Sequence, residues 1–266
     1  MTLVTAVPTK ITWPPPGRPM TTADLDRMPD DGRRYELLYR VLIVTPAPPS
    51  TDAATRPNDR AIVGVMTKGA LTRQAILRHG VQVAYRVGLG GLTIGALASG
   101  TSMSKSGLFA HFGSKGSLQL EVLALARADF VDTVIRPALA VARGEPRVRA
   151  LFENWLACGR ARMPGGCLFV KAATEFDEQS GQVRDQLARD HRDLQESIAL
   201  IFRTGVTEGH FREDADPEQF ASDLNGVMLA YYQANRLLDD PAAETRARNA
   251  FEALIAAAAR SRPDQP

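Results

Sequence analysis

Proline is distributed so unevenly along this chain of 266 residues that it divides the sequence into segments with different folding options. Ten of the 17 prolines fall within the first 57 residues, and none lies between Lys68 and Arg136. Proline cannot donate a backbone hydrogen bond and clashes with the preceding helical turn, so the first segment cannot hold long helices. The sequence therefore predicts a largely irregular extension over residues 1–67, followed by an all-α protein.

One apolar run interrupts the proline-rich extension. Residues 34–45, RYELLYRVLIVT, carry β-branched side chains near their end and predict one short strand or a piece of a hairpin. Because an isolated strand of this size has no sheet to join, we expect the run to be poorly ordered.

Helical spacing begins at Lys68. Apolar residues recur every three or four positions from Leu71 to Tyr85, which predicts an amphipathic helix that ends at Gly88. Thr93 suits the N-cap of a short second helix. After a polar break a third helix is expected to begin at Ser104 and to stop by Gly113. Ser114 would then cap a fourth helix that runs toward Pro137.

The rest of the chain, from about Arg147 to Arg260, has helical periodicity without a repeat of fixed length, which disfavours a solenoid. We therefore expect three parts. Residues 1–67 form the extension, residues 68–120 a domain of short helices, and residues 121–266 a larger helical domain.

Charge separates the two helical parts. Residues 68–120 contain six basic side chains and no Asp or Glu, whereas the chain from Glu121 onward contains 18 basic and 23 acidic residues. A small basic module attached to an acidic body is typical of a protein that meets a polyanion through the module alone. The alternative is a chance cluster on a solvated face.

Several classes of protein are disfavoured by what the sequence lacks. The two cysteines, Cys158 and Cys167, belong to no CxxC motif and have no neighbouring histidine pair, so we expect no metal site and no cofactor. Neither a signal peptide nor a run of eighteen apolar residues is found. We expect a soluble, cytoplasmic protein that is not an enzyme.

Two short helices separated by a tight polar turn, and preceded by a longer helix, predict a tri-helical helix-turn-helix. Its last helix would lie in a major groove. Ser104-Lys105-Ser106-Gly107 supplies small residues at the tip, so that the helix end can come close to DNA. Lys105 could contact a phosphate or a guanine edge, and the amides at the start of the helix suit a phosphate oxygen.

The segments Leu92–Ala98 and Met103–Leu118, with the run MSKSGLFAHFGSKGSL, closely resemble the DNA-binding domain of TetR-family regulators. The resemblance covers about fifty residues. It implies a homodimer that binds a palindromic operator on double-stranded DNA, with a larger helical domain behind it for a small-molecule effector and dimerisation. Residues 165–169 and 175–177 also look like part of one C-terminal subfamily of these regulators.

The resemblance implies which side chains touch DNA, mostly at phosphates: Thr93, Ser104, Lys105, Ser106, Gly107, Phe109, His111 and Lys115. Phe109 could also pack inside the domain, His111 could cap or pack, and Phe112 is expected in the core. The turn departs from the family pattern, with Thr101 and Ser102 in place of an apolar residue and glycine, which predicts strain of about 1 kcal/mol. Gly80, where the family often has alanine, costs a similar amount.

Large apolar side chains in the helical domain are candidates for an effector pocket, since such cavities are mostly apolar. The alternative for each is an ordinary place in the helical core. The candidates are Trp155, Cys158, Phe169, Phe176, Phe202, Met228 and Tyr231. Cys167 could be a thiol sensor, although no cationic neighbour in sequence would lower its pKa.

A second resemblance concerns the extension. Residues 20–25, 30–37 and 42–48 resemble the opening of Uma-type restriction-endonuclease-like proteins, over about thirty residues. A nuclease would need a later Asp and a Glu-x-Lys pair to hold a metal, and the chain turns into the regulator before such a strand appears. We interpret the segment as an inactive remnant. The alternatives are a metal-dependent nuclease that uses Glu36, and a degenerate fusion product that neither binds nor cuts DNA.

Taken together, the sequence predicts a ligand-responsive repressor. Its last two long helices, about Pro217 to Leu238 and Pro241 to Arg260, would pair with their symmetry mates in a four-helix dimer interface. Effector binding would favour a dimer whose recognition helices are badly spaced for successive major grooves.

Overall fold

A computed structural model of the chain describes residues 28, 34–38, 41–45, 68–100, 104–161 and 166–260. The chain divides into two compact units, residues 1–61 and residues 62–266. The first contains the described strands and the second the described helices.

In the first unit, β1 (Arg34–Leu38) pairs antiparallel with β2 (Val41–Thr45). Arg34 lies opposite Thr45, and Leu38 lies opposite Val41. The apolar run is therefore a hairpin rather than a single strand. This corrects the expectation that residues 34–45 would lack a sheet to join, because the second half of the run supplies the partner of the first. Glu36, the candidate nuclease carboxylate, lies within β1 opposite Ile43.

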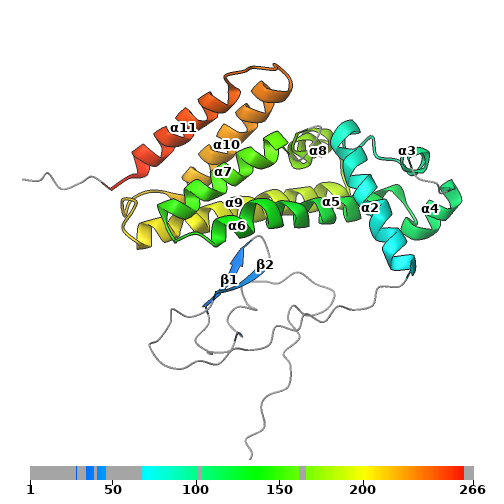
Figure 1. Cartoon of the computed structure of the whole chain (residues 1–266), viewed down its shortest axis with the longest axis horizontal. Coiled ribbons are helices and arrows are strands. Elements are labelled where there is room, and N and C mark those ends of the chain that lie inside the picture. Colours follow the sequence, from blue (N-terminus) through cyan, green and yellow to red (C-terminus); the bar gives the residue numbers. More distant parts are fainter. Residues whose placement is uncertain are drawn as a thin grey trace, which may run out of the picture. The chain divides into compact units, whose positions relative to one another are not determined.

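The second unit is all-α over its described residues (Figure 1). Its elements are α2 (Lys68–Val87), α3 (Ile94–Ser99), α4 (Lys105–Phe112), α5 (Lys115–Phe130), the π-helical turn η1 (Val131–Ile135), α6 (Arg136–Leu139), α7 (Glu145–Ala161), α8 (Leu168–Phe176), α9 (Gln182–Thr207), α10 (Pro217–Arg236) and α11 (Ala243–Ala258).

Three hydroxyl side chains set the starts of the helices that follow α2. The Oγ atoms of Thr93, Ser104 and Ser114 accept hydrogen bonds from the amides of Ala96, Gly107 and Ser117 at 3.0, 3.1 and 3.0 Å. Each cap satisfies an amide that the first turn of a helix leaves without a partner. The predicted starts of α3, α4 and α5 are thereby confirmed.

One continuous core joins these short helices to the body. Leu97 of α3, Leu108 of α4 and Leu118 of α5 are fully buried together with Leu168 and Ala172 of α8. Sequence reasoning did not separate α8 as a helix. The helix-breaking sequence Met163-Pro-Gly-Gly and the short length of α8 hid a regular apolar spacing at positions 168, 169, 172 and 176.

Gly80 has a packing role that the sequence did not reveal. It is buried where α2 crosses α5, and a Cβ added there would lie 3.0 Å from Cγ2 of Val122. Since Val122 is fully buried and stiff about χ1, the absence of a side chain at Gly80 lets the helices approach. The cost in helix propensity is thus offset by closer packing.

A long rod built from α5, η1 and α6 connects the short helices to the body. The π-helical turn ends two residues before Pro137, which lacks the backbone amide that a regular helix uses. Arg127 on this rod forms ion pairs with Asp190 and Asp193 of α9, at 2.6 and 3.0 Å. The rod is therefore held against α9 by a nearly buried charge cluster.

Aromatic stacking organises the far end of the body. Phe202 of α9 stacks on Phe211 and on Phe220 of α10, with ring centroids 4.4 and 4.2 Å apart. Phe152 of α7 stacks on Phe251 of α11 at 4.0 Å. In Figure 1 the orange and red helices α10 and α11 lie side by side at this end.

The described helices include none that is both long and apolar enough to cross a membrane. Within the same described ranges, no group of three or more His, Cys, Asp or Glu residues is placed to hold a metal ion.

Candidate nucleic-acid interface and effector cavity

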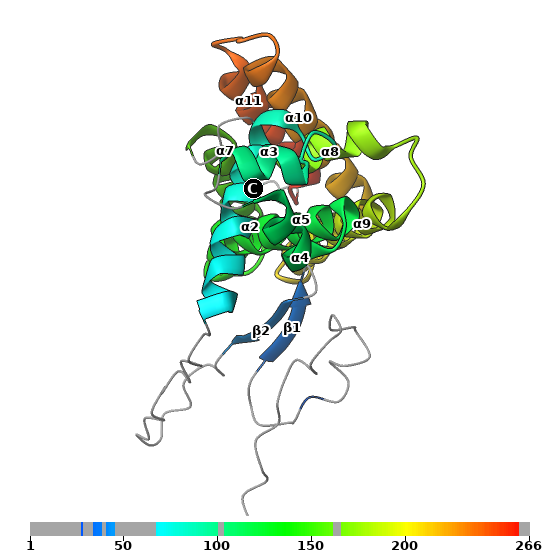
Figure 2. The same cartoon turned by 90° about the vertical axis from the view of Figure 1, so that its right-hand side faces the viewer.

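Helix α4 presents a hydrophilic tip on a buried base. Leu108 is fully buried and Phe112 is 5 % exposed, which fixes one side of α4 against the core. Ser104, Lys105 and Ser106 are exposed at the beginning of the helix. Figure 2 looks onto the end of the protein that carries α3 and α4. The predicted tip is therefore available to a large partner.

The N-terminus of α3 lies beside Lys105. A Cβ placed on Gly95 would be 3.6 Å from Cε and 3.9 Å from Nζ of Lys105, and 3.8 Å from Oγ1 of the exposed Thr93. Neither α3 nor α4 has an acidic residue in its first turn. The positive ends of two helix dipoles and one ammonium group thus gather on the same side, an arrangement suited to phosphate.

The later residues of α4 differ in environment. Phe109 keeps 55 % of its surface exposed and does not pack into the core. Gly107 is half-buried and donates its amide to the Ser104 cap. His111 is half-buried, with its ring 6.3 Å from that of Phe112. Of the two alternatives for Phe109, the structure favours a side chain that faces outward.

Two basic residues of the module, Lys115 and Arg73, form contacts within the protein. Nζ of Lys115 donates to the carbonyl of Gly90 at 2.6 Å, so this side chain braces the loop between α2 and α3 although it is exposed. Arg73 pairs with Glu121 at 2.6 Å and lies over the ring of Phe112 at 5.2 Å. Thr101 and Ser102, the departures in the turn, lie outside the described residues.

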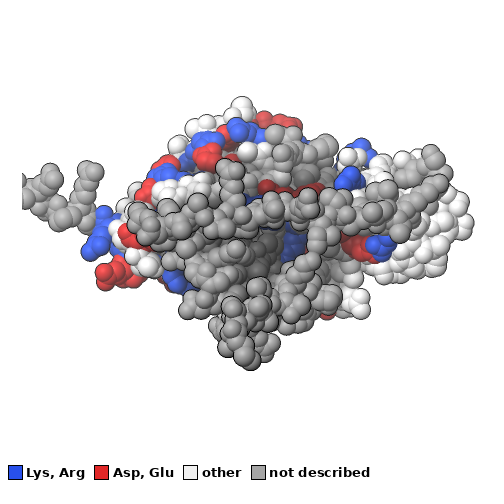
Figure 3. All heavy atoms as spheres, turned by 60° about the horizontal axis from the view of Figure 1, so that its bottom comes forward, with Lys and Arg blue, Asp and Glu red and all other residues white. Residues whose placement is uncertain are grey.

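The end of the protein that carries α3 and α4 has fewer charged side chains on the face drawn in Figure 3 than the helical body has. On the face drawn in Figure 3, acidic and basic side chains are interspersed where the helical body is not covered by grey residues, whereas the right-hand end is mostly uncharged, with basic and acidic groups at its border. The stretch from Lys68 to Leu120, which includes α3 and α4, contains no Asp or Glu. Such a surface does not repel a polyanion.

Side chains of α8 form hydrogen bonds with the end of α2 and with the loop between α2 and α3. These contacts were not predicted from the sequence. The carboxylate of Glu175 accepts the amide of Gly90 at 2.6 Å, and Nζ of Lys171 donates to the carbonyl of Tyr85 at 2.8 Å. The buried side chain of Gln119, from α5, donates to the carbonyl of Leu89 at 2.7 Å. We call Lys171, Glu175 and Gln119 the loop clamp. Burial lowers the pKa of Lys171.

A small enclosed cavity of about 10 Å³ lies where α2, α5, α7, α8 and α10 meet. It is lined by Tyr85, Phe130, Cys158, Gly166, Cys167, Phe169 and Tyr232. None of these side chains is an acid or a base at neutral pH. Burial raises the pKa of Cys167 to about 11 and also raises the pKa of both tyrosines. The thiol is therefore protonated, which argues against a reactive sensor in this state.

Two of the seven predicted pocket residues, Cys158 and Phe169, line this cavity. Trp155 is buried with its ring edge-on to Phe130 at 5.8 Å, next to the cavity. Phe202, Met228 and Tyr231 are buried and do not line this cavity, and Phe202 belongs to the stacked aromatic cluster. Sequence spacing marked these residues as buried, and it could not tell which of them share a cavity.

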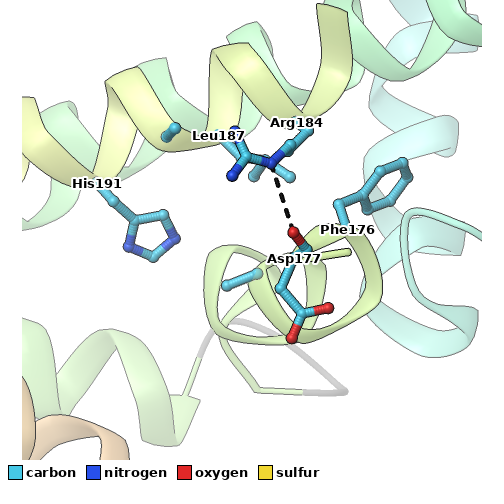
Figure 4. Close-up of a pocket in the computed structure, with 7 residues that line it drawn as sticks. Phe176, Asp177, Arg184, Leu187 and His191 are labelled. Atoms are coloured by element: carbon cyan, nitrogen blue, oxygen red, sulfur yellow. Dashed lines mark hydrogen bonds between the residues drawn. The ribbon is translucent and has the colours of Figure 1, made fainter. Parts of the chain in front are cut away.

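Phe176 lines a separate, open groove of about 200 Å³ between α8 and α9 (Figure 4). Leu187 joins it on the apolar floor, while Arg184, Asp177 and His191 lie at the rim. Nε of Arg184 donates to the carbonyl of Asp177 at 3.4 Å. The predicted pocket residues are thus divided among the cavity, this groove and the packed core.

Comparison with known proteins adds independent information. Residues 144–251 match the family described as "Tetracyclin repressor-like, C-terminal domain". Among curated protein sequences, none matches the chain. The comparisons give no support to the Uma-type resemblance of the extension.

Solved structures with the same fold include a TetR-family transcriptional regulator from Cytophaga hutchinsonii, at 17 % identity and a TM-score of 0.67, covering 75 % of this chain and all of that one. AibR in complex with isovaleryl coenzyme A and operator DNA matches at 19 % identity and 0.57, over 69 % and 97 % of the two chains. A putative transcriptional regulator from Saccharomonospora viridis in complex with choline matches at 21 % and 0.59, over 71 % and 98 %.

The match of the C-terminal domain and the likeness of the described helices to these structures agree with the resemblance carried by residues 92–118. Proteins of this kind are regulators and not enzymes. Residues 144–251 thus match the C-terminal domain family of tetracyclin repressor-like proteins, and the described helices share the fold of TetR-family regulators.

Proposed function

We propose that this regulator is a ligand-responsive repressor that binds a palindromic operator as a homodimer in the cytoplasm. Residues 68–120 are the DNA-binding domain and residues 121–266 the effector-binding and dimerisation domain, with residues 1–67 as an extension. The observation that carries the proposal is the capped, acid-free tip of α4, exposed at Lys105 while Leu108 and Phe112 anchor its base.

DNA contact follows from the chemistry of this tip. Ser104, Lys105 and Ser106 carry the polar contacts of the recognition helix, with Lys105 and Thr93 at a phosphate near the start of α3. Lys115 and His111 lie further along, toward the flanking backbone. Phosphate contacts position a recognition helix, and side chains in the groove select the sequence.

Dimer formation is supported by the outward sides of the last two helices. Gly226, Leu229 and Ala230 are exposed on α10, and Ala250, Ala253 and Ala257 are exposed on α11. Small and apolar side chains allow two helix pairs to approach closely and bury their surface in a four-helix interface. A two-fold dimer presents two recognition helices to two half-sites, which explains why the operator would be a palindrome.

Effector binding is supported by the enclosed cavity, because Tyr85 brings the DNA-binding domain directly into its wall. At about 10 Å³ the cavity holds no effector in this conformation, so a ligand would have to separate the helices around it. Two residues of the loop clamp, Lys171 and Glu175, lie on α8, whose first turn lines the cavity, and the clamp would carry that movement to α3. AibR and the Saccharomonospora viridis protein hold isovaleryl coenzyme A and choline in their structures, and a small organic effector is proposed here by analogy.

A gel-shift assay with DNA from upstream of the gene tests the proposal. Wild-type protein is expected to bind with an affinity that falls steeply between about 50 and 200 mM salt, because phosphate contacts release counterions. Lys105→Ala should bind more weakly, and its salt slope should be smaller by about 0.9 if one phosphate contact is lost.

The matched control is Arg189→Ala, which removes an exposed positive charge from α9 in the body. It should bind like the wild type. Equal binding by wild type and Lys105→Ala would contradict the assignment of α4. The absence of binding to every duplex at low salt would contradict the function as a whole.

The dimer is tested separately. Leu229→Glu places a charge on the exposed side of α10 and is expected to shift the protein from dimer to monomer in size-exclusion chromatography with light scattering. Leu200→Glu is the control, because Leu200 is 38 % exposed on α9, similar to the 42 % of Leu229, but lies outside this face. A monomeric wild type, or two variants with the same mass, would refute the interface.

A further inference from the structure

Phe109 is a large apolar side chain that the fold does not use. It is 55 % exposed, while Leu108 before it and Phe112 one turn later are buried and anchor α4. Ala110, which follows it, is also exposed. Because the core is complete without the Phe109 ring, its place on the outward side of α4 requires a different explanation.

The surroundings of Phe109 indicate what kind of partner it meets. Lys105 lies one turn earlier on the same side of α4, and Ser106 lies beside it, so the ring belongs to the surface that carries the polar contacts. That surface contains no carboxylate, since residues 68–120 have no Asp or Glu. The partner of the ring is therefore the same polyanion that Lys105 and Ser106 approach.

A phenyl ring makes no hydrogen bond with a base edge, and it gains free energy on leaving water only against an apolar surface. In the major groove the edges of the bases present donors and acceptors, and the apolar feature that distinguishes one natural base from another is the C5-methyl group of thymine. Resting on the function proposed above, we infer that Phe109 reads a thymine in each operator half-site by packing on that methyl group, with Ala110 widening the apolar contact.

Replacing thymine by deoxyuridine tests this inference, because the base loses its methyl group and keeps its hydrogen-bonding edge. An operator is first selected from a random duplex pool. Each thymine is then replaced in turn, and binding is measured by fluorescence anisotropy at one fixed ionic strength. At one thymine per half-site, wild-type protein should bind about four-fold more weakly, as expected for the burial of one methyl group.

Two variants locate the effect. Phe109→Ala should bind the thymine and the deoxyuridine operators equally well. Lys105→Ala should bind both more weakly and still show the four-fold difference. Because Phe109 is exposed, its replacement should leave the thermal unfolding of the protein unchanged, which circular dichroism checks.

The outcomes separate this inference from the proposed function. Binding of a selected palindrome without a deoxyuridine penalty at any thymine overturns the inference alone. So does an equal penalty in Phe109→Ala, since another residue would then contact the methyl group. Uniform weakening of Phe109→Ala on all sequences means that the ring packs on sugar and phosphate, which also overturns it. Failure to bind any duplex overturns the proposed function itself.

Discussion

Arg127 neutralises two carboxylates that are almost completely removed from water. Its guanidinium lies 2.6 Å from Asp190 and 3.0 Å from Asp193, whose side chains are 1 % and 7 % exposed. Replacing Arg127 by methionine keeps most of the volume but leaves both carboxylates without this cation. Breaking a buried ion pair by removing one partner costs about 3–5 kcal/mol. For a domain of this size that corresponds to a fall in melting temperature of about 6–20 °C.

The loss should depend on pH. Burial raises the pKa of Asp190, against the opposing attraction of Arg127. A carboxyl whose pKa is raised in the folded state favours folding below its ordinary pKa, and this contribution is lost as pH rises through the folded-state value. Without Arg127 the pKa of Asp190 rises further. The deficit of Arg127→Met should therefore be larger at about pH 7.5 than at about pH 5.

Urea unfolding followed by circular dichroism at the two pH values measures this difference. Arg192→Met is the matched control, because Arg192 is exposed on α9, and it should unfold like the wild type at both. The reasoning is refuted by a loss of unfolding free energy below about 1 kcal/mol in Arg127→Met, or by a loss that does not change with pH. Either result would mean that removing the guanidinium does not leave an uncompensated buried charge on the two carboxylates.

Two further variants test the loop clamp and the packing of α2. Glu175→Ala leaves the Gly90 amide without its carboxylate acceptor, so operator affinity measured by fluorescence anisotropy should fall. Glu178→Ala removes an exposed neighbouring carboxylate and should bind the operator like the wild type. Equal affinities of the two variants would exclude a role for the clamp. Gly80→Ala should lower the free energy of unfolding by about 1 kcal/mol, because overpacking of the new methyl group against Val122 outweighs the better helix propensity of alanine. A higher melting temperature of this variant would contradict this reasoning.

The sequence alone predicted the features that depend on neighbours a few residues apart. The caps at Thr93, Ser104 and Ser114 each bond an amide three residues later, so the starts of α3, α4 and α5 could be placed from residue type and spacing. The same holds for the burial of Phe112 and for the acid-free surface around Lys105.

Only the tertiary structure decided contacts between distant segments. Glu175 and Gly90 are 85 positions apart, and Arg127 and Asp190 are 63 apart, so no local spacing could pair them. Periodicity marks a residue such as Tyr85 as buried, but the partners and the cavity it lines depend on how helices cross. Local hydrogen bonds and helical spacing therefore determined the elements of this protein, whereas long-range packing determined how the end that carries α3 and α4 is joined to the cavity.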